Sequence, residues 1–221
     1  MIRLASNSDI EQIKRVYQER FYTDNEYTNK VFTYLFPSSK CFVYIENEQI
    51  ISTLFLIPIN YYCKEKIHSG YYLYGVATSK IASGRGIGKQ LLKFAINQSK
   101  AENKKFIICR PANAKLFEYY NELGFTTNIS KVPYKIPDQV IENISDLPSA
   151  AKMLNEDITL DFSYRFMWPV AILENIFQIE DIESQLETTT QKEEKFLMAN
   201  ILDSTVAKDF SSESFFIFPM E

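Results

Sequence analysis

Apolar residues recur at helical spacing in the first forty positions of the chain. After a short predicted strand at residues 2–4, they predict a helix that begins at Ser8, where Glu11 three positions later completes a capping box. The apolar positions of this helix are Ile10, Ile13, Val16, Tyr17 and Phe21. A second helical stretch covers about residues 27–36 and ends at Pro37.

Residues that favour strands take over from position 41. Residues 41–45 and 50–57 flank the polar turn 46–49, which is a β-hairpin signal. A third strand is predicted over about residues 71–78, followed by a glycine-rich turn. The next helix runs to about Ala101, and its core face is expected to hold Ile87, Leu91, Leu92, Ala95 and Ile96.

The alternation of strands and helices continues through the middle of the chain. Residues 106–109 are continuously apolar, as in a strand buried on both faces. A helix over about 114–123 ends at Gly124, a usual C-terminal capping residue, and another strand begins over 125–129. This order predicts an α/β (α+β) fold, with a mixed, mostly antiparallel central sheet flanked by helices.

The pattern changes after Pro133 and Pro137, which suggests two parts, a core of residues 1–137 and an extension of residues 138–221. In the extension, residues 138–155 are polar and predicted to be a linking loop. Pro169 suits the first turn of a helix whose stripe would be Ile172, Ile176, Ile179, Ile182 and Leu186. Residues 195–201 and 214–218 resemble final strands, so the extension is predicted to hold one helix and two or three strands.

Composition places the chain among ordinary globular proteins. Of its 221 residues 46% are hydrophobic and 24% are charged, which allows a sizeable core and argues against disorder. No apolar run approaches the roughly 20 residues of a membrane span, and the N-terminus lacks the apolar stretch of a signal peptide. The scattered cysteines are expected to be buried free thiols, which favours a reducing cytoplasm: Cys41, Cys63 and Cys109.

Charge is divided unevenly along the chain. Residues 1–137 carry 19 Lys and Arg against 11 Asp and Glu, a balance of +8, whereas residues 138–221 carry 5 against 17, a balance of −12. A basic part fits nucleic acid, a polyanionic small cofactor or a solvated surface. The cations form no dense block, so we expect neither a nucleic-acid nor a membrane partner.

The glycine-rich turn, residues 83–89, is the clearest chemical signal in the sequence. Glycines let a turn fold tightly, and the free N–H groups of the following helix then form an anion site. The spacing is wrong for the phosphate loop Gly-x-x-x-x-Gly-Lys-Ser/Thr. It also fails the Gly-x-Gly-x-x-Gly pattern of dinucleotide-binding folds, and a hairpin precedes the turn.

Two motifs resemble the GNAT acyltransferase superfamily. Residues 74–78 and 85–92 are similar to its acyl-CoA motif Gln/Arg-x-x-Gly-x-Gly/Ala, which falls here on Ser83, Gly86 and Gly88. Ser replaces Gln or Arg at the first position, and Arg85 restores the positive charge. Residues 113–125 resemble a second motif, Asn-x-x-Ala-x-x-Leu-Tyr-x-x-x-Gly-Phe, with matches at Asn113, Tyr120, Gly124 and Phe125 and replacements at Leu116 and Tyr119. The resemblance covers about residues 1–137.

This resemblance implies a GNAT-type sheet and direct attack of an amine on the thioester of acetyl-CoA. The strand before the turn would splay from strand 106–109, and a backbone N–H near Val76 would polarise the thioester carbonyl. The implied cofactor-binding residues are Val76, Ala77, Thr78, Gly84, Arg85, Gly86, Ile87, Gly88, Lys89 and Asn113. Tyr120 would be the general acid that protonates the departing thiolate or hydrogen-bonds its sulfur. The alternative for Tyr120 is packing in the core stripe with Leu116 and Leu123.

The general base cannot be assigned from the strand before the turn, because residues 71–74 contain neither Glu nor His. His68 lies at the start of that strand and is expected at the surface. A water chain or a carboxylate of the extension, including the C-terminus, is the alternative. Trp168 is expected in the core, together with Phe162, Tyr164 and Phe166.

The sequence therefore predicts an N-acetyltransferase that moves an acetyl group to a primary amine of a small molecule or peptide, without a metal. The extension would pack on the core or on the acceptor side, where its negative charge would attract a cationic amine. A non-catalytic acyl-CoA-binding or sensing protein is the main alternative, and a nucleic-acid-associated protein is a second. We expect a monomer or a homodimer.

Overall fold

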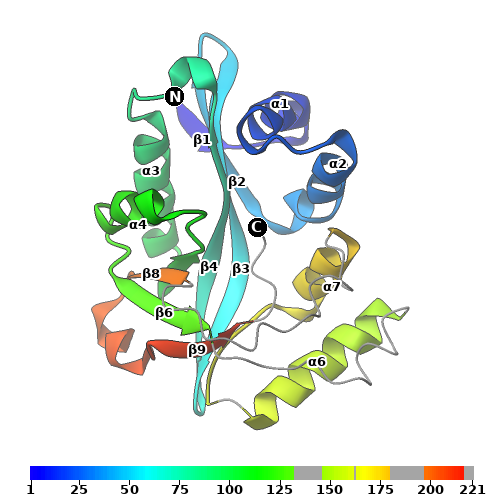
Figure 1. The fold of residues 1–221 in the computed structure, drawn as a ribbon, viewed down its shortest axis with the longest axis vertical. Coiled ribbons are helices and arrows are strands. Elements are labelled where there is room, and N and C mark those ends of the chain that lie inside the picture. Colours follow the sequence, from blue (N-terminus) through cyan, green and yellow to red (C-terminus); the bar gives the residue numbers. More distant parts are fainter. Residues whose placement is uncertain (132–145, 162, 180–196, 217–221) are drawn as a thin grey trace.

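In a computed structural model of the chain, which describes residues 1–131, 146–161, 163–179 and 197–216, helices cover both faces of a central sheet (Figure 1). The strands are β1 (Ile2–Leu4), β2 (Lys40–Glu46), β3 (Gln49–Cys63), β4 (Lys66–Thr78), β5 (Phe106–Cys109), β6 (Thr127–Lys131), β7 (Tyr164–Met167), β8 (Leu197–Ile201) and β9 (Glu213–Phe216). The α-helices are α1 (Ile10–Phe21), α2 (Asn25–Tyr34), α3 (Ile87–Ala101), α4 (Ala114–Asn121), α6 (Leu147–Asp161) and α7 (Val170–Ile179).

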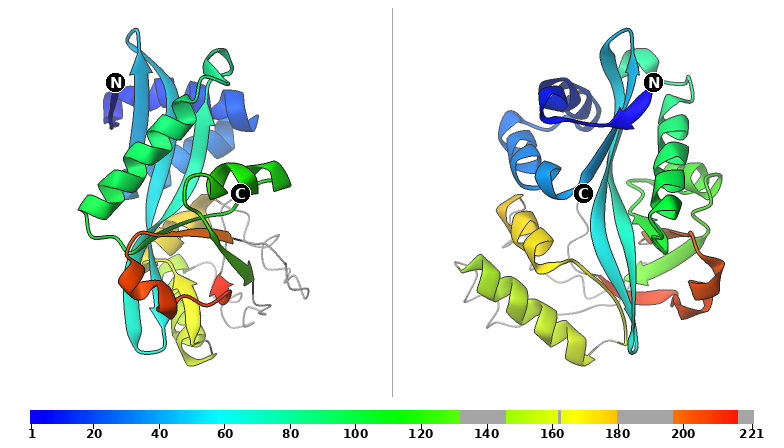
Figure 2. Two further views of the ribbon diagram at one scale, coloured as in Figure 1. Left: turned by 90° about the vertical axis from the view of Figure 1, so that its left-hand side faces the viewer. Right: turned by 180° about the vertical axis from the view of Figure 1, so that it is seen from behind.

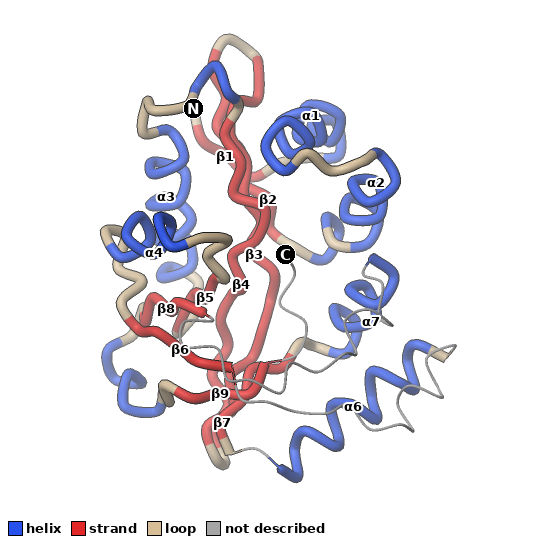
Figure 3. The backbone as a smooth tube through the Cα atoms, viewed as in Figure 1, coloured by secondary structure: helices blue, strands red, loops and turns tan. Residues whose placement is uncertain are grey.

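The sheet confirms the predicted fold class. Strands β1 to β4 pair antiparallel in sequence order, and β5 pairs parallel with β4. Helices α1, α2, α6 and α7 lie on one face, and α3 and α4 lie on the other (Figures 2 and 3). All five positions predicted for the core face of α3 are buried, which confirms its helical pattern: Ile87, Leu91, Leu92, Ala95 and Ile96.

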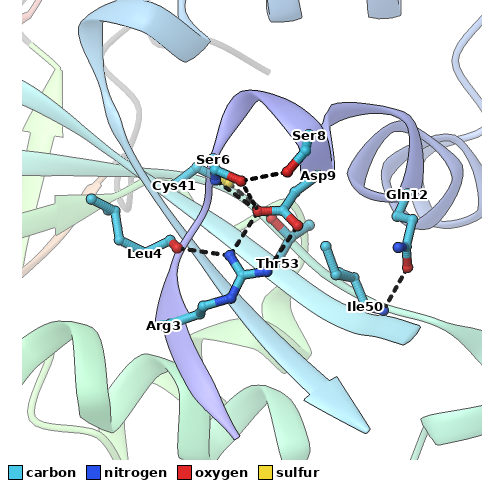
Figure 4. A network of polar contacts seen from close by, with 9 residues as sticks. All are labelled: Arg3, Leu4, Ser6, Ser8, Asp9, Gln12, Cys41, Ile50 and Thr53. Atoms are coloured by element: carbon cyan, nitrogen blue, oxygen red, sulfur yellow. Dashed lines mark hydrogen bonds and ion pairs between the residues drawn. The ribbon is translucent and has the colours of Figure 1, made fainter. Parts of the chain in front are cut away.

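The N-terminal cap differs from the prediction. A 3₁₀ turn over 7–9 precedes α1, and the capping box pairs Ser6 with Asp9 rather than Ser8 with Glu11. Asp9 also accepts two hydrogen bonds from Arg3, at 2.7 and 2.9 Å (Figure 4). Arg3 and the Ser6 contacts lower the pKa of the Asp9 carboxyl well below its usual value. The earlier cap therefore fixes β1 to the start of α1, a contact that helical spacing alone does not reveal.

The half of the sheet around Cys63 and Lys66, at the bottom of Figure 1, closes into a ring of strands. The long strand β3 pairs with β2 through its first half, but Asn60 to Cys63 pair with β7 instead. From β4 the pairing continues through β5, β8, β6, β9 and β7, and so returns to β3. Among the described strands this is a closed ring, filled mainly by buried aromatic side chains.

The C-terminal region departs from the prediction in its helices. Residues 147–161 form α6, so the predicted loop over 138–155 is wrong for its second part, and the described region holds two α-helices instead of one. Its strands β8 and β9 fall within the two predicted final strands or one residue before them. Residues 132–145, 180–196 and 217–221, with the predicted stripe positions Ile182 and Leu186 and the C-terminal carboxylate, lie outside the described residues, as does Phe162.

The two largest buried clusters lie on opposite faces of the sheet. The larger joins α1, α2 and α7 to the interior of the strand ring, and the smaller lies under α3 and α4. Trp168 is buried against Tyr72 and Phe216, which confirms its predicted place in the core. The three cysteines are free and buried, as predicted, and burial raises the pKa of the Cys41 thiol to about 12.

Candidate functional site

The glycine turn presents unpaired backbone N–H groups at the start of α3. Gly86 is the N-cap residue, with φ 73° and no side-chain cap. The first hydrogen bond of the helix runs from the Gln90 N–H to the Gly86 carbonyl, and in the described part of the chain no group accepts from the N–H groups of residues 84–89. A Cβ at Gly84 or Gly86 would meet no atom within 4 Å. Free N–H groups at the positive end of a helix favour the binding of an anion.

Carboxylates hold both cationic side chains of the turn. Arg85 makes a bidentate pair with Glu46 of the β2–β3 hairpin, at 2.7 and 2.9 Å. Lys89 pairs with Glu122, just beyond α4, at 2.8 Å. Each cation lowers the pKa of its partner carboxyl, chiefly by hydrogen bonding. Both pairs are partly exposed, so an arriving phosphate competes with these carboxylates for Arg85 and Lys89.

One edge of β4 lacks a strand partner next to this turn. Pairing with β5 ends at Tyr72 and Ile108, whereas β4 continues to Thr78 and β5 ends at Cys109. Over residues 73–78, therefore, no described strand pairs with the edge of β4 that faces away from β3. Unpaired N–H and C=O groups along such an edge can bond an extended ligand.

A β-bulge lies within this free edge. Phe55 pairs with Tyr74 but Thr53 pairs with Ala77, so β4 has an extra residue at Gly75 and Val76. Gly75 has φ 59°, and a Cβ there would lie 3.1 Å from atoms of both Phe55 and Tyr17, so any other residue would be strained at this position. The bulge turns the backbone at Val76 out of the regular ladder, as bulges near active sites commonly do.

The end of β4 touches the start of α3. The Thr78 hydroxyl is hydrogen-bonded to Ser52 at 2.9 Å and would lie 3.1 Å from a Cβ on Gly88. The fold therefore brings the predicted residues 76–78 and 84–89 to one edge of the molecule. Asn113 caps α4, its side chain accepting from the Leu116 N–H at 3.3 Å.

The adjacent phenols of Tyr119 and Tyr120 point to different places. The Tyr119 hydroxyl would lie 3.6 Å from a Cβ on Gly88, beside the turn. Tyr120 is 7% exposed and packs against Phe125. Burial, with smaller contributions from Cys109, Tyr119 and Tyr72, raises the pKa of the Tyr120 phenol well above its usual value. Tyr120 therefore lies near the point where β4 and β5 diverge.

His68 is not at the surface, which corrects the prediction. It is 9% exposed, and its Nε2 lies 2.9 Å from the Asp209 carboxylate, which also accepts from Lys66 at 2.9 Å. The strand begins earlier than predicted, at Lys66, and the 3₁₀ segment Ser204–Asp209 covers this end of it. His68 thus fastens the C-terminal region to β4 at the end opposite to the glycine turn.

A group of phenols that no sequence pattern reveals lies on the α1 and α2 face. The Tyr74 hydroxyl lies 2.6 Å from that of Tyr17 and 3.3 Å from that of Tyr27. Burial, above all, raises the pKa of the Tyr74 phenol well above its usual value. The helical pattern placed Tyr17 on the core face, but nothing in the sequence indicated that its hydroxyl meets one from β4.

Two further features are absent from the described part of the chain. No three or more His, Cys, Asp or Glu side chains there are grouped as metal ligands would be. No helix in those segments is both long and apolar enough for a membrane span.

Comparisons with known proteins agree with these features. A family model described as an acetyltransferase (GNAT) domain matches residues 1–127. A conserved protein of unknown function from Enterococcus faecalis V583, described as a probable N-acyltransferase, has a similar structure, with 12% identity and a TM-score of 0.61. The match covers 79% of this chain but only 47% of that one. A GCN5-related N-acetyltransferase from Kribbella flavida is similar at 9% identity and a TM-score of 0.51, over 92% of this chain and 73% of that one. Such identities show a shared fold alone, and no curated protein sequence matches the chain.

Proposed function

The chain belongs to the GNAT acetyltransferase family, and from this premise we propose that it transfers an acetyl group from acetyl-CoA to a primary amine. The acceptor is a small molecule or a peptide. One observation carries the proposal, namely that the open N–H groups of the glycine turn adjoin the unpaired, bulged edge of β4. An anion site beside a free strand edge suits a ligand with a pyrophosphate and an extended amide-containing arm.

The donor would bind in two parts. Its pyrophosphate would accept hydrogen bonds from the N–H groups of residues 84–89, with Arg85 and Lys89 adding positive charge. Its arm would pair with the free edge at Val76, Ala77 and Thr78, and Asn113 would contact it from α4. The bulge would direct the Val76 N–H at the thioester carbonyl, where negative charge develops during attack.

Tyr120 is the proposed acid for the departing thiolate. A phenol with a raised pKa is a weaker acid than a thiol of pKa near 8.5, so its main contribution is a hydrogen bond that stabilises the sulfur anion. The same shift keeps the phenol protonated at the alkaline pH at which an amine acceptor, of pKa near 10.4, loses its proton. At that pH the phenol is thus still protonated and the amine is neutral, as the reaction requires.

The acidic C-terminal region, 138–221, is proposed to attract a cationic acceptor, because its −12 charge contrasts with the +8 of residues 1–137. The pair Lys66–Asp209 and the pair Lys105–Asp203 each join a cation of the first part to a carboxylate of the second, which supports packing of this region on the core. The buried free thiols are consistent with the cytoplasm as the compartment.

A titration with acetyl-CoA tests donor binding. We expect acetyl-CoA at millimolar concentration to raise the melting temperature, because a ligand that binds only the folded state stabilises it. Coenzyme A without an acyl group should also stabilise, since the pyrophosphate and arm remain. No shift with either compound would contradict the proposal.

Turnover is then measured by the release of free thiol with polyamines, aminoglycosides, amino acids and peptides as acceptors. With an accepted amine, we expect Tyr120→Phe to lower kcat about 100-fold, within the usual range for a lost acid, with little change in the KM for acetyl-CoA. Tyr119→Phe is the matched control and should keep a kcat near that of the wild type. Unchanged kcat in Tyr120→Phe would remove Tyr120 from the acid role.

A non-catalytic acyl-CoA-binding protein is the second candidate. It is favoured by residues 73–78 of β4, beside the proposed thioester position, where neither Glu nor His occurs to take the proton of an amine. Strong stabilisation by acetyl-CoA without thiol release from any acceptor class would favour this function over catalysis.

A further inference from the structure

We propose that three aromatic side chains, Tyr72, Trp168 and Phe216, set the length of the acyl group and restrict the donor to the shortest acyl chains. The inference rests on the proposed function, because it concerns the acyl end of the same donor. It gives the C-terminal region a direct part in the site, since that region contributes both Trp168 and Phe216. We call these three side chains the aromatic stop.

The aromatic stop lies where β4 and β5 diverge. Tyr72 is the last residue of β4 that pairs with β5, opposite Ile108. Its ring lies 5.4 Å from that of Trp168, edge on, and 5.8 Å from that of Phe216. The rings of Trp168 and Phe216 are 5.7 Å apart, so each of the three contacts the other two.

The direction of the donor brings its acyl end to this place. With the pyrophosphate at the glycine turn, the arm runs from Thr78 toward lower residue numbers along β4. The free edge ends at Tyr72, and beyond it β5 occupies the pairing positions. An acyl chain that continues past the thioester therefore meets the aromatic stop rather than open solvent.

The stop has no spare room and is held in place by strand pairing. The three side chains are 1%, 3% and 1% exposed, in the order Tyr72, Trp168, Phe216. Trp168 directly follows β7, which pairs with both β3 and β9, and Phe216 pairs opposite Phe166 in the ring. Figure 3 shows β7 and β9 beside the lower part of β3 and β4. Close-packed aromatics in a closed ring do not move aside for added methylenes without disturbing these pairs.

The test compares the dissociation constants of acetyl-, butyryl- and hexanoyl-CoA by calorimetry, with coenzyme A as reference. We expect the wild type to bind hexanoyl-CoA at least about tenfold more weakly than acetyl-CoA, since each misfitting methylene costs a factor of about ten or more in a tight apolar pocket. Trp168→Leu opens the stop and should lower this hexanoyl-to-acetyl ratio at least about tenfold.

Phe166→Leu is the matched control. Phe166 is equally buried and lies in the same ring, 5.8 Å from Phe216, but no ring contact joins it to Tyr72. It should keep the wild-type ratio. Tyr72→Phe retains the aromatic ring and should also keep the wild-type ratio. Tyr72→Leu should lower the hexanoyl-to-acetyl ratio as Trp168→Leu does. It therefore serves as the test variant if Trp168→Leu does not fold.

Equal affinity of the wild type for acetyl- and hexanoyl-CoA would overturn the inference, as would an unchanged ratio in a folded Trp168→Leu or Tyr72→Leu variant. A lowered ratio in Phe166→Leu would also count against it, because general loosening of the ring would then explain the effect. Failure of coenzyme A and all its esters to bind would instead overturn the proposed function, and the inference with it.

Discussion

The two ends of β4 are built in opposite ways. At the Thr78 end, the strand has a free edge, a bulge and an exposed glycine turn, with backbone N–H groups open to a ligand. At the Lys66 end, the strand lies inside a closed ring, under His68–Asp209 and a cluster of aromatic side chains. One end presents backbone to solvent, and the other buries side chains.

This difference separates binding from stability within a single strand. The backbone N–H groups at the turn are free of protein partners, so changing the turn should alter affinity more than folding. The aromatic side chains inside the ring are buried among many partners, so changing them should alter folding first. Tyr72 lies at the boundary, where the paired part of β4 ends.

The largest effect on folding is expected from Gly70→Ala in the ring. A Cβ there would lie 2.6 Å from three atoms of the Phe106 ring, which is 0% exposed and cannot swing aside into solvent. Overpacking of this kind costs about 1–3 kcal/mol of the free energy of unfolding. Urea denaturation would measure the loss, while the dissociation constant for acetyl-CoA of the folded variant should stay unchanged. A variant as stable as the wild type would contradict the close packing described here.

Gly86→Val, at the turn, should weaken ligand binding more than it destabilises the fold, which is the reverse of the effect of Gly70→Ala. The Cβ would meet nothing, but a β-branched residue at φ 73° is strained by about 1–2 kcal/mol, and relief of that strain turns the N–H groups away from the ligand. We expect the dissociation constant for acetyl-CoA to rise at least about tenfold, with a smaller change in unfolding than Gly70→Ala causes. If acetyl-CoA bound as tightly as to the wild type, the turn would not be the phosphate site.

Glu46→Gln should raise the affinity for acetyl-CoA, with a smaller effect than that of Gly86→Val. It releases Arg85 from its bidentate partner and removes a negative charge beside the anion site. Exposed ion pairs contribute little, so we expect acetyl-CoA to bind only about two- to fivefold more tightly. Glu26→Gln, which breaks the exposed pair with Lys30 on α2, is the control and should leave affinity unchanged. Weaker binding in Glu46→Gln would mean that Glu46 positions Arg85 for the phosphate.

The smallest expected effect is on the pH dependence of stability, and it arises at the Lys66 end of β4. Hydrogen bonding from Lys66, and secondly from His68, lowers the pKa of the Asp209 carboxyl in the folded protein. Its contribution to stability is therefore present above the unfolded pKa, near 3.9, and is lost as the pH falls through the lower folded value. Asp209→Asn should lower the urea midpoint at pH 7. The difference in urea midpoint between the variant and the wild type should become smaller as the pH falls toward 3. A difference that is constant with pH would contradict this origin.

The local part of the fold was predictable because its signals are short in sequence. The hairpin around residues 46–49, the buried strand 106–109 and the face of α3 each follow from residue spacing within one element, and each is present. The errors lie where a distant segment intervenes. The sequence predicts His68 at the surface because its partner Asp209 is far along the chain, and it predicts a loop in the first part of α6 because polar residues obscure the helical pattern there.

The same limit applies to the candidate site. The glycine turn and the helix from Asn113 were identifiable because backbone chemistry and capping are local properties. The phenol group around Tyr74 and the aromatic stop were not, because each combines residues from elements that meet only after folding. No spacing rule joins Tyr72 to Trp168 or Phe216.

By itself, the sequence determined the order of strands and helices in residues 1–131, the family motifs and the glycine turn at the start of α3. Propensity, periodicity and glycine conformations act over a few residues, so they can be read directly. Only the tertiary structure decided that β7, β8 and β9 close the sheet into a ring, that β4 has a free end and a buried end, and that aromatics of the C-terminal region meet Tyr72. Strand pairing between distant segments depends on the packing of the whole chain, and local pattern does not encode it.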